Sequence, residues 1–203
     1  MMSLTHCANN SNPPSDVSTS QQGCFFLVVG PSGAGKDSLM DGAKQTLLDK
    51  GFVFAKRVIT KPPGMVGEDY TSCTAEEFKQ RSQNLEFLIT WQAHGYDYGL
   101  ERTLLDQQAL GCHIVANGSR AVVNKVKDLV PNLVVVLVTA PVKTLAKRLA
   151  ARGRETEPEI KERLQRQTQP FDDTTEVLTI VNDGTLAAGI EKFTDALLER
   201  SRR

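Results

Sequence analysis

Gly30-Pro31-Ser32-Gly33-Ala34-Gly35-Lys36 carries the strongest structural signal in this 203-residue chain. It directly follows the apolar run 25–29, which is typical of a strand buried on both faces, and it opens a helical pattern that extends to about residue 50. A strand, a glycine-rich turn, a lysine and a helix in this order indicate a phosphate-binding loop, whose backbone N–H groups surround an anion at the positive end of the helix. Lys36 adds a point charge for the β- and γ-phosphates of a nucleotide. We therefore predict that all seven residues bind a nucleotide.

Asp37 and Ser38 follow the lysine, where loops of this type usually place a Ser or Thr that ligates Mg²⁺. A carboxylate beside a triphosphate is repelled unless a cation lies between them. We therefore predict that Asp37 and Ser38 contact both the nucleotide and a Mg²⁺ ion, Asp37 directly or through water. The alternative for Asp37 is a carboxylate that only complements the helix dipole.

The composition narrows the class of protein. The chain has 24 Lys and Arg against 24 Asp and Glu, and a balanced charge gives no field that attracts nucleic acid. Its four cysteines are scattered without a C-x-x-C pair, so we expect no zinc or dithiol motif and a reducing, cytoplasmic setting. No apolar run is long enough to cross a membrane. We expect no membrane or nucleic-acid partner.

The first residues differ in composition from the rest. Residues 1–22 include fourteen Ser, Thr, Asn, Gln or Pro and no Lys or Arg. Such a segment cannot bury enough apolar surface to offset the entropy lost on ordering. We predict that residues 1–23 form a disordered tail and that residues 24–203 form a single domain.

From residue 24 onward, short apolar or β-branched runs alternate with longer helical patterns, which indicates an α/β fold with a mostly parallel sheet flanked by helices. The predicted strands span 25–29, 52–60, 86–91, 113–116, 133–139 and 177–181. A capping box at Thr74 and Glu77 predicts a short helix there. The other predicted helices span 36–50, 102–110, 121–130, 141–152, 158–169 and 186–200.

From about Cys24 to its C-terminus the sequence resembles the guanylate kinase family, and more closely the sugar-phosphate branch of ribose 1,5-bisphosphate phosphokinases. The resemblance rests on residues 30–38, 59–61, 67–70, 91–95 with 98–99, 117–120, 152–155 and 182–184. It implies a P-loop nucleoside-monophosphate-kinase-like fold with an acceptor-binding segment at about 58–100 and a lid at about 148–166. The implied reaction transfers a phosphoryl group from ATP, with Mg²⁺, to ribose 1,5-bisphosphate, giving ADP and 5-phosphoribosyl 1-diphosphate in a salvage route linked to phosphonate breakdown.

Departures from the guanylate kinase pattern favour the sugar-phosphate branch. Leu100 stands where that pattern has a hydroxyl residue that contacts guanine, and Asn117 stands near an aspartate with the same task. A site that hydrogen-bonds a base loses heavily in affinity without these groups. The alternatives are a guanylate or other nucleoside monophosphate kinase, and a non-catalytic interaction module. The complete phosphate loop argues against the module.

By the same resemblance, six residues are predicted to bind the acceptor. Lys61 stands where the family carries an arginine, and since lysine cannot bind phosphate in a bidentate fork, Arg57 is a candidate to replace it. The six are Arg57, Lys61, Glu68, Tyr70, Tyr98 and Asn117. For Tyr70 and Tyr98 the alternative is core packing, and for Glu68 it is an exposed loop carboxylate.

The acceptor phosphate is already an anion, so the implied reaction needs no general base. The sequence accordingly offers no convincing catalytic histidine. His94 is either a substrate contact or a turn residue. Catalysis then depends on cations over the transferred group. Residues 143–166 have a local excess of Lys and Arg, which indicates a lid that excludes water. Lys36, Arg148, Arg152 and Arg163 are the predicted catalytic cations. A solvated, salt-bridged helix is the alternative for Arg163. Asn182 is expected near the adenine or in a simple turn.

Overall fold

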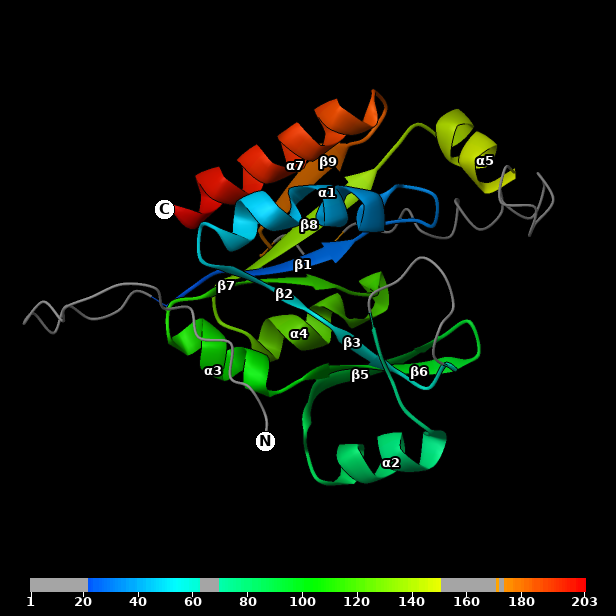
Figure 1. Ribbon diagram of the computed structural model, residues 1–203, viewed down its shortest axis with the longest axis vertical. Coiled ribbons are helices and arrows are strands. Elements are labelled where there is room, and N and C mark those ends of the chain that lie inside the picture. The colour runs from blue at the N-terminus through cyan, green and yellow to red at the C-terminus, as the bar shows by residue number, and fades with distance from the viewer. Residues whose placement is uncertain (1–21, 63–69, 151–170, 172–173) are drawn as a thin grey trace, which may run out of the picture.

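The computed structural model describes residues 22–62, 70–150, 171 and 174–203, and its centre is a parallel five-stranded sheet (Figure 1). The strand order is β2 (Phe52–Ala55), β7 (His113–Asn117), β1 (Phe25–Val29), β8 (Leu133–Thr139) and β9 (Val177–Val181). All five residues of β1 are buried, as a central parallel strand requires. Because parallel strands end at the same edge, the segments that follow β1, β7 and β9 are brought together there.

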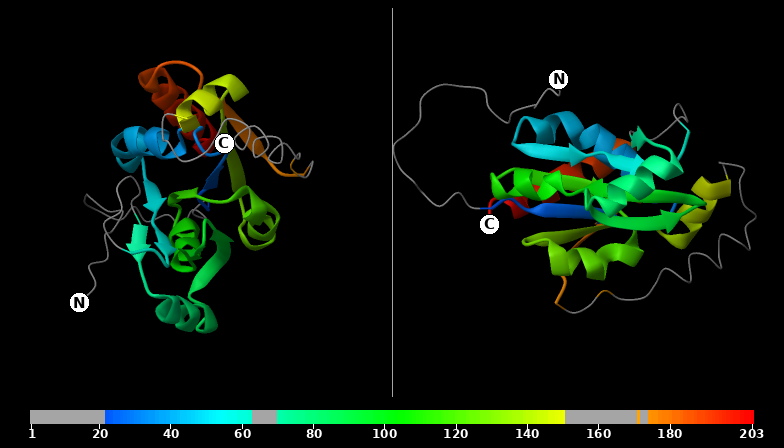
Figure 2. Two further views of the ribbon diagram at one scale, coloured as in Figure 1. Left: turned by 90° about the vertical axis from the view of Figure 1, so that its right-hand side faces the viewer. Right: turned by 90° about the horizontal axis from the view of Figure 1, so that it is seen from below.

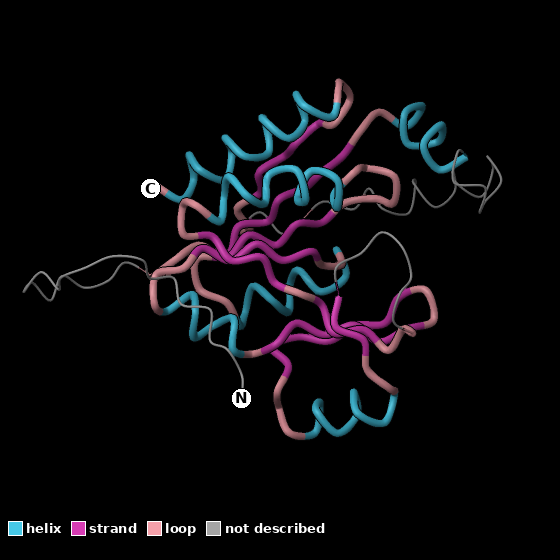
Figure 3. Tube along the Cα trace, viewed as in Figure 1, coloured by secondary structure: helices cyan, strands magenta, loops and turns pink. Residues whose placement is uncertain are grey.

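Helices cover both faces of this sheet, which confirms the predicted α/β architecture. On one face α1 (Lys36–Leu48) packs against α7 (Leu186–Ser201), and on the other lie α3 (Thr103–Ala109) and α4 (Val123–Leu129) (Figure 3). Alternate residues of β1 serve the two cores: Phe26 packs with the α1 and α7 side, and Leu27 with the α4 side. The helix α5 (Val142–Ala150) follows β8, and a short 3₁₀ helix, η1 (Arg120–Val122), precedes α4.

A second sheet lies beyond α3 and α4, and the sequence did not predict it. Its order is β4 (Tyr70–Ser72), β3 (Arg57–Ile59), β6 (Tyr96–Glu101) and β5 (Phe87–Ala93). The strands β3 and β4 are parallel, whereas β6 is antiparallel to both β3 and β5. The helix α2 (Ala75–Gln83) covers the outer face, so that the layers run from α7 and α1 down to α2 (Figure 2).

The predicted strand 52–60 is in fact two strands that belong to different sheets. The chain leaves the large sheet at Lys56, after β2 has paired with β7, and enters the small sheet as β3, which pairs with β6. The prediction was wrong at this point because a local apolar pattern does not reveal a change of pairing partner. The segment thereby links the two sheets.

The strand β6 was also missed, since residues 96–101 were not assigned to a strand. The hairpin that joins β5 to β6 has only His94 and Gly95 in its turn, and both have positive φ, 51° and 79°. This backbone matches the right-handed twist of the two strands, and it favours glycine at the second position. The turn places His94 at the tip of the hairpin.

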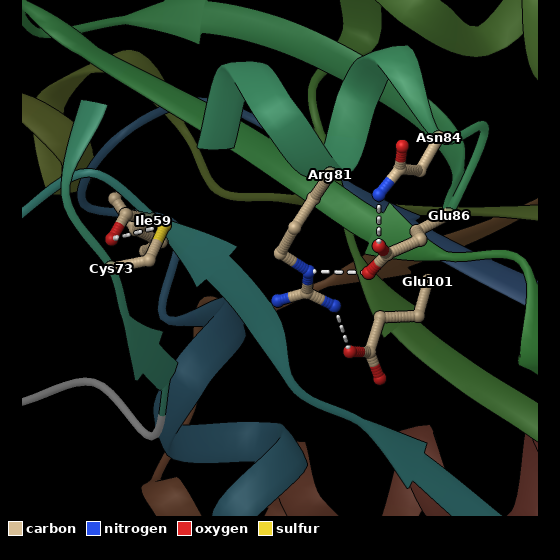
Figure 4. A network of polar contacts seen from close by, with 6 residues as sticks. All are labelled: Ile59, Cys73, Arg81, Asn84, Glu86 and Glu101. Atoms are coloured by element: carbon tan, nitrogen blue, oxygen red, sulfur yellow. Dashed lines mark hydrogen bonds and ion pairs between the residues drawn. The ribbon is translucent and has the colours of Figure 1, made fainter. Parts of the chain in front are cut away.

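The helix α2 is attached to the small sheet by a polar network around Arg81 (Figure 4). Its guanidinium donates to Glu86 Oε2 at 2.8 Å and to Glu101 Oε1 at 2.6 Å, and it lies 5.0 Å from the centre of the Phe87 ring. The predicted capping box is confirmed: Thr74 and Glu77 exchange hydrogen bonds at the start of the helix. Together these contacts fix α2 against the small sheet.

Part of the predicted tail is held against the domain. Gly23 exchanges two hydrogen bonds with Gln108, through the Gly23 N–H and the Gln108 side-chain amide. The rest of the tail, residues 1–21, lies outside the described residues. Among the helices of the described segments, none is long and apolar enough to span a bilayer.

The surroundings of His113, at the start of β7, favour the neutral ring. Its Nδ1 accepts a hydrogen bond from the Cys24 N–H at 3.0 Å, and its ring centre lies 4.8 Å from that of Phe52. Burial lowers the pKa of His113 below its usual range. Protonation of this ring would place a charge in a partly buried position, and it would also remove the lone pair with which Nδ1 accepts the hydrogen bond.

We expect the free energy of unfolding to decrease as the pH falls below about 6.5, because the unfolded chain then binds a proton that folded His113 resists. In His113→Asn the amide oxygen can accept from Cys24 without titrating, so this dependence should weaken. Urea unfolding between about pH 5 and 8 measures it. His94→Asn, in the exposed turn, is the control and should keep the wild-type slope. Equal slopes in His113→Asn and wild type would contradict the assignment.

Candidate nucleotide and acceptor site

The phosphate loop connects β1 to α1 as predicted, and its backbone requires glycine where it enters the helix. Gly35 precedes the first residue of α1 and has a φ of 92°. A Cβ atom there would lie 2.5 Å from Asn182 Nδ2, so both the conformation and the space exclude other residues. The Lys36 ammonium donates to the carbonyls of Gly30 at 2.8 Å and Pro31 at 3.1 Å, which places the charge at the mouth of the loop.

Asn182 and Arg148 support the loop from behind. The Asn182 side chain is 4% exposed, and its Nδ2 donates to the Ala34 carbonyl at 2.8 Å. Its backbone N–H donates to Thr139 at the end of β8. Arg148, on α5, lies 3.4 and 3.5 Å from the carbonyls of Gly33 and Ala34. The structure therefore places Asn182 against the loop, a role that neither of the two expectations, proximity to the adenine or a simple turn, included.

A cavity of about 580 Å³ joins this loop to the small sheet. Its lining includes most of the predicted binding residues: 30–33, 35–38, Arg57, Tyr98 and Asn117. Ala34 is fully buried beneath it. Sequence reasoning assigned no binding role to six further residues that line the cavity, since β5 and the segment after β7 bring most of them in from remote parts of the chain. They are Asp41, Trp91, Ala93, Gly118, Ser119 and Arg120. His94, left open between a substrate contact and a turn residue, lies in the turn and also lines the cavity.

Asp37 is held at the start of α1 by groups from two other elements. Asn117 Nδ2, at the end of β7, donates to Asp37 Oδ1 at 2.6 Å, and the Arg57 guanidinium lies 4.0 Å from the same oxygen. The Asp37 side chain is 46% exposed and lines the cavity. Asp37 thus remains accessible as a ligand. Asn117 lines the cavity as well, and its hydrogen bond orients the Asp37 carboxylate.

The described residues suit Mg²⁺ bound mainly by phosphates. They contain no group of three or more His, Cys, Asp or Glu side chains that could enclose a metal. Mg²⁺ in nucleotide sites typically takes one or two protein oxygens and completes its shell with phosphates and water. Asp37 and Ser38, beside the loop, provide such oxygens.

Arg57, on β3 of the small sheet, lines the cavity and packs against an aromatic side chain. Its guanidinium carbon lies 5.9 Å from the centre of the Tyr98 ring, which in turn stacks on Trp91 with ring centres 5.4 Å apart. The Arg57 side chain is 13% exposed. Contact with an aromatic face restricts the orientation of the guanidinium, whose planar shape suits bidentate hydrogen bonding.

Two of the predicted acceptor residues, Lys61 and Tyr70, are described but do not line the cavity. Tyr70 donates its hydroxyl to the Pro62 carbonyl at 2.6 Å, and the Lys61 ammonium lies 5.5 Å from the centre of the Tyr70 ring. Neither residue lines the cavity in this structure. Glu68, Arg152 and Arg163 lie outside the described residues, as does most of the predicted lid.

Asn182→Asp removes the donor that holds the Ala34 carbonyl but keeps the size of the side chain. We expect the free energy of unfolding to fall by about 1–3 kcal/mol, as for other buried groups that lose a partner. The dissociation constant for ATP should rise roughly tenfold, which corresponds to about 1.4 kcal/mol. Urea unfolding and calorimetric titration measure the two. Asp183→Asn, at the exposed next position, is the control; ATP affinity unchanged in Asn182→Asp would refute this role.

Comparison with known proteins identifies the family. A sequence model described as guanylate kinase matches residues 23–200. The ribose 1,5-bisphosphate phosphokinase PhnN of Brucella melitensis is 41% identical over 179 residues, which cover 88% of this chain and 93% of that protein. The bifunctional ribose 1,5-bisphosphokinase-thymidine phosphorylase of Cupriavidus pinatubonensis is 51% identical over 177 residues. This chain spans only 27–30% of the length of three such bifunctional relatives.

The fold agrees with a solved structure of the same family. The crystal structure of guanylate kinase from Anaplasma phagocytophilum superposes with a TM-score of 0.64 at 16% identity, covering 90% of this chain and 88% of the other. At this identity the likeness concerns the fold alone. The family model and the relatives, however, confirm the resemblance seen in the motifs: the chain belongs to the guanylate kinase family.

Proposed function

We propose that the protein transfers the terminal phosphoryl group of ATP to ribose 1,5-bisphosphate, giving ADP and 5-phosphoribosyl 1-diphosphate. The observation that carries this proposal is that a complete phosphate loop and an arginine on the acceptor side line one cavity. The names of relatives that share most of this chain's length support the choice of acceptor. The resemblance also suggests a place for the reaction in a salvage route linked to phosphonate breakdown.

The proposed chemistry needs positioning and positive charge rather than proton transfer. An acceptor phosphate oxygen is already ionised at neutral pH, so no base has to remove a proton. Lys36 and Arg148 lie at the loop, and we propose that Arg152 and Arg163 approach the transferred group from the lid. Mg²⁺, when bound beside Asp37 and Ser38, would neutralise charge on the nucleotide phosphates. The arrangement suits in-line transfer between two anions.

Two features favour a sugar phosphate over GMP as the acceptor. Leu100 is fully buried in the core and offers no hydrogen-bonding group to a base. The Asn117 amide donates to Asp37, and the side chain is only 7% exposed. At these two described positions the site therefore offers no free polar group to a guanine edge, and such a deficit typically costs a factor of roughly 10⁴ or more.

The acceptor assay tests this proposal directly. With ATP and Mg²⁺, we expect product from ribose 1,5-bisphosphate at a kcat/KM at least roughly 10³-fold above that for GMP, in line with discriminations based on missing hydrogen bonds. Product formation can be followed by ³¹P NMR, with Lys36→Met as the inactive control. Preference for GMP would identify a guanylate kinase, and ATP binding without transfer to either acceptor would also overturn the proposal.

Asp37→Ala tests the predicted metal contact. We expect the Mg²⁺ concentration for half-maximal rate to rise roughly tenfold, because the variant loses one charged oxygen near the ion. Initial rates at fixed ATP and increasing Mg²⁺ measure this shift. Asp41→Ala, one helical turn further along α1, is the matched control and should change the Mg²⁺ dependence less. An unaltered Mg²⁺ curve in Asp37→Ala would leave only the helix-dipole role.

A further inference from the structure

Arg120 lines the same cavity as Arg57 but comes from a different part of the fold. Arg57 belongs to β3 in the small sheet, whereas Arg120 begins η1, directly after β7 of the large sheet. The backbone before Arg120 is fixed, since the Gly118 N–H donates to the Val28 carbonyl at 2.9 Å and the Ser119 hydroxyl accepts from the Ala121 N–H at 3.3 Å. The two arginines therefore stand on separate, rigid supports.

Each guanidinium is also placed against an aromatic ring. The Arg120 guanidinium carbon lies 4.0 Å from the centre of the Phe171 ring, closer than the 5.9 Å between Arg57 and Tyr98. Phe171 itself packs against the core that contains β1 and α4. Partial burial lowers the pKa of Arg120, yet an arginine stays charged at neutral pH. Less rotamer entropy is then lost when such a side chain binds a ligand.

The charges of the cavity suit an acceptor with more than one phosphate. Among its described lining residues, Lys36, Arg57 and Arg120 are cationic, and Asp37 and Asp41 are acidic. A phosphate monoester carries a charge of about −1.5 to −2 at neutral pH, so a sugar bisphosphate brings twice the charge of a monophosphate. Arg57 alone can hold one phosphate in a bidentate fork, and a second phosphate calls for a second fork.

We propose that Arg57 and Arg120 form a two-ended clamp in which each arginine binds one phosphate of a pentose bisphosphate acceptor. This inference takes the identity of the acceptor from the proposed function and adds a second anion subsite, at Arg120. The clamp selects for two phosphates on one sugar, since a monophosphate leaves one guanidinium without its ligand.

Calorimetric titration with ribose 1,5-bisphosphate, ribose 1-phosphate and ribose 5-phosphate tests the clamp. Arg120→Met should weaken binding of the bisphosphate by roughly 10- to 100-fold, the usual range for a lost charge-assisted hydrogen bond. Arg120→Met should weaken binding of one monophosphate by a similar factor. The dissociation constant of the other monophosphate should change by less than about threefold, which is below the effect expected for a lost charge-assisted hydrogen bond. Arg57→Met should affect the opposite monophosphate. The exposed Arg202→Met, at the end of α7, is the control for loss of a surface arginine.

Arg120→Lys keeps a cation near Phe171 without the planar fork, so this variant should bind the bisphosphate with intermediate affinity. It replaces Arg120→Met in the test if that variant does not fold. Equal weakening of both monophosphates by Arg120→Met, or no weakening of the bisphosphate, would overturn the clamp. Titration requires no turnover, so the two proposals can fail separately. Arg120-dependent binding without phosphoryl transfer refutes only the proposed function, and normal bisphosphate affinity in an active Arg120→Met enzyme refutes only the clamp.

Discussion

One buried hydrogen bond, from the Asn182 amide to the Ala34 carbonyl, underlies the shape of the nucleotide site. A phosphate loop binds an anion only if its N–H groups point inward, so its carbonyls must find donors elsewhere. Asn182 provides such a donor from the end of β9, and its own backbone is fixed by Thr139 at the end of β8. Anion binding is therefore a property of the whole carboxyl edge of the sheet rather than of the loop sequence alone.

The sequence predicted well those elements that depend on interactions between residues close together in the chain. The strand at 133–139 has the predicted bounds, and the capping box at Thr74 starts α2. The small sheet was missed because β3 and β4 are only three residues long and derive their stability from partners far along the chain. Short strands of this kind carry no periodicity that a local pattern could reveal.

The candidate site shows the same difference between features set locally and features that depend on remote parts of the chain. The loop, Asp37 and Arg57 could be selected from motif and resemblance, and the structure brings them to one cavity. Trp91 and Arg120 belong to stretches that carry the resemblance, but they were given no binding role, because their place in the cavity depends on the strand order and on the packing of the two sheets. The contact between Asn117 and Asp37 joins residues 80 positions apart, which no spacing rule anticipates.

The apolar layer around α3 and α4 has a consequence for how the protein can move. Leu88, Ile89 and Leu100 of the small sheet share one core with Phe25 and Leu27 of the central strand. Separating the two sheets would expose these side chains to water, at a free-energy cost of about 25 cal/mol for each Å² of apolar surface. The shared core therefore resists separation of the sheets, and it holds the strands that carry Arg57 and Tyr98 against the sheet that carries the phosphate loop.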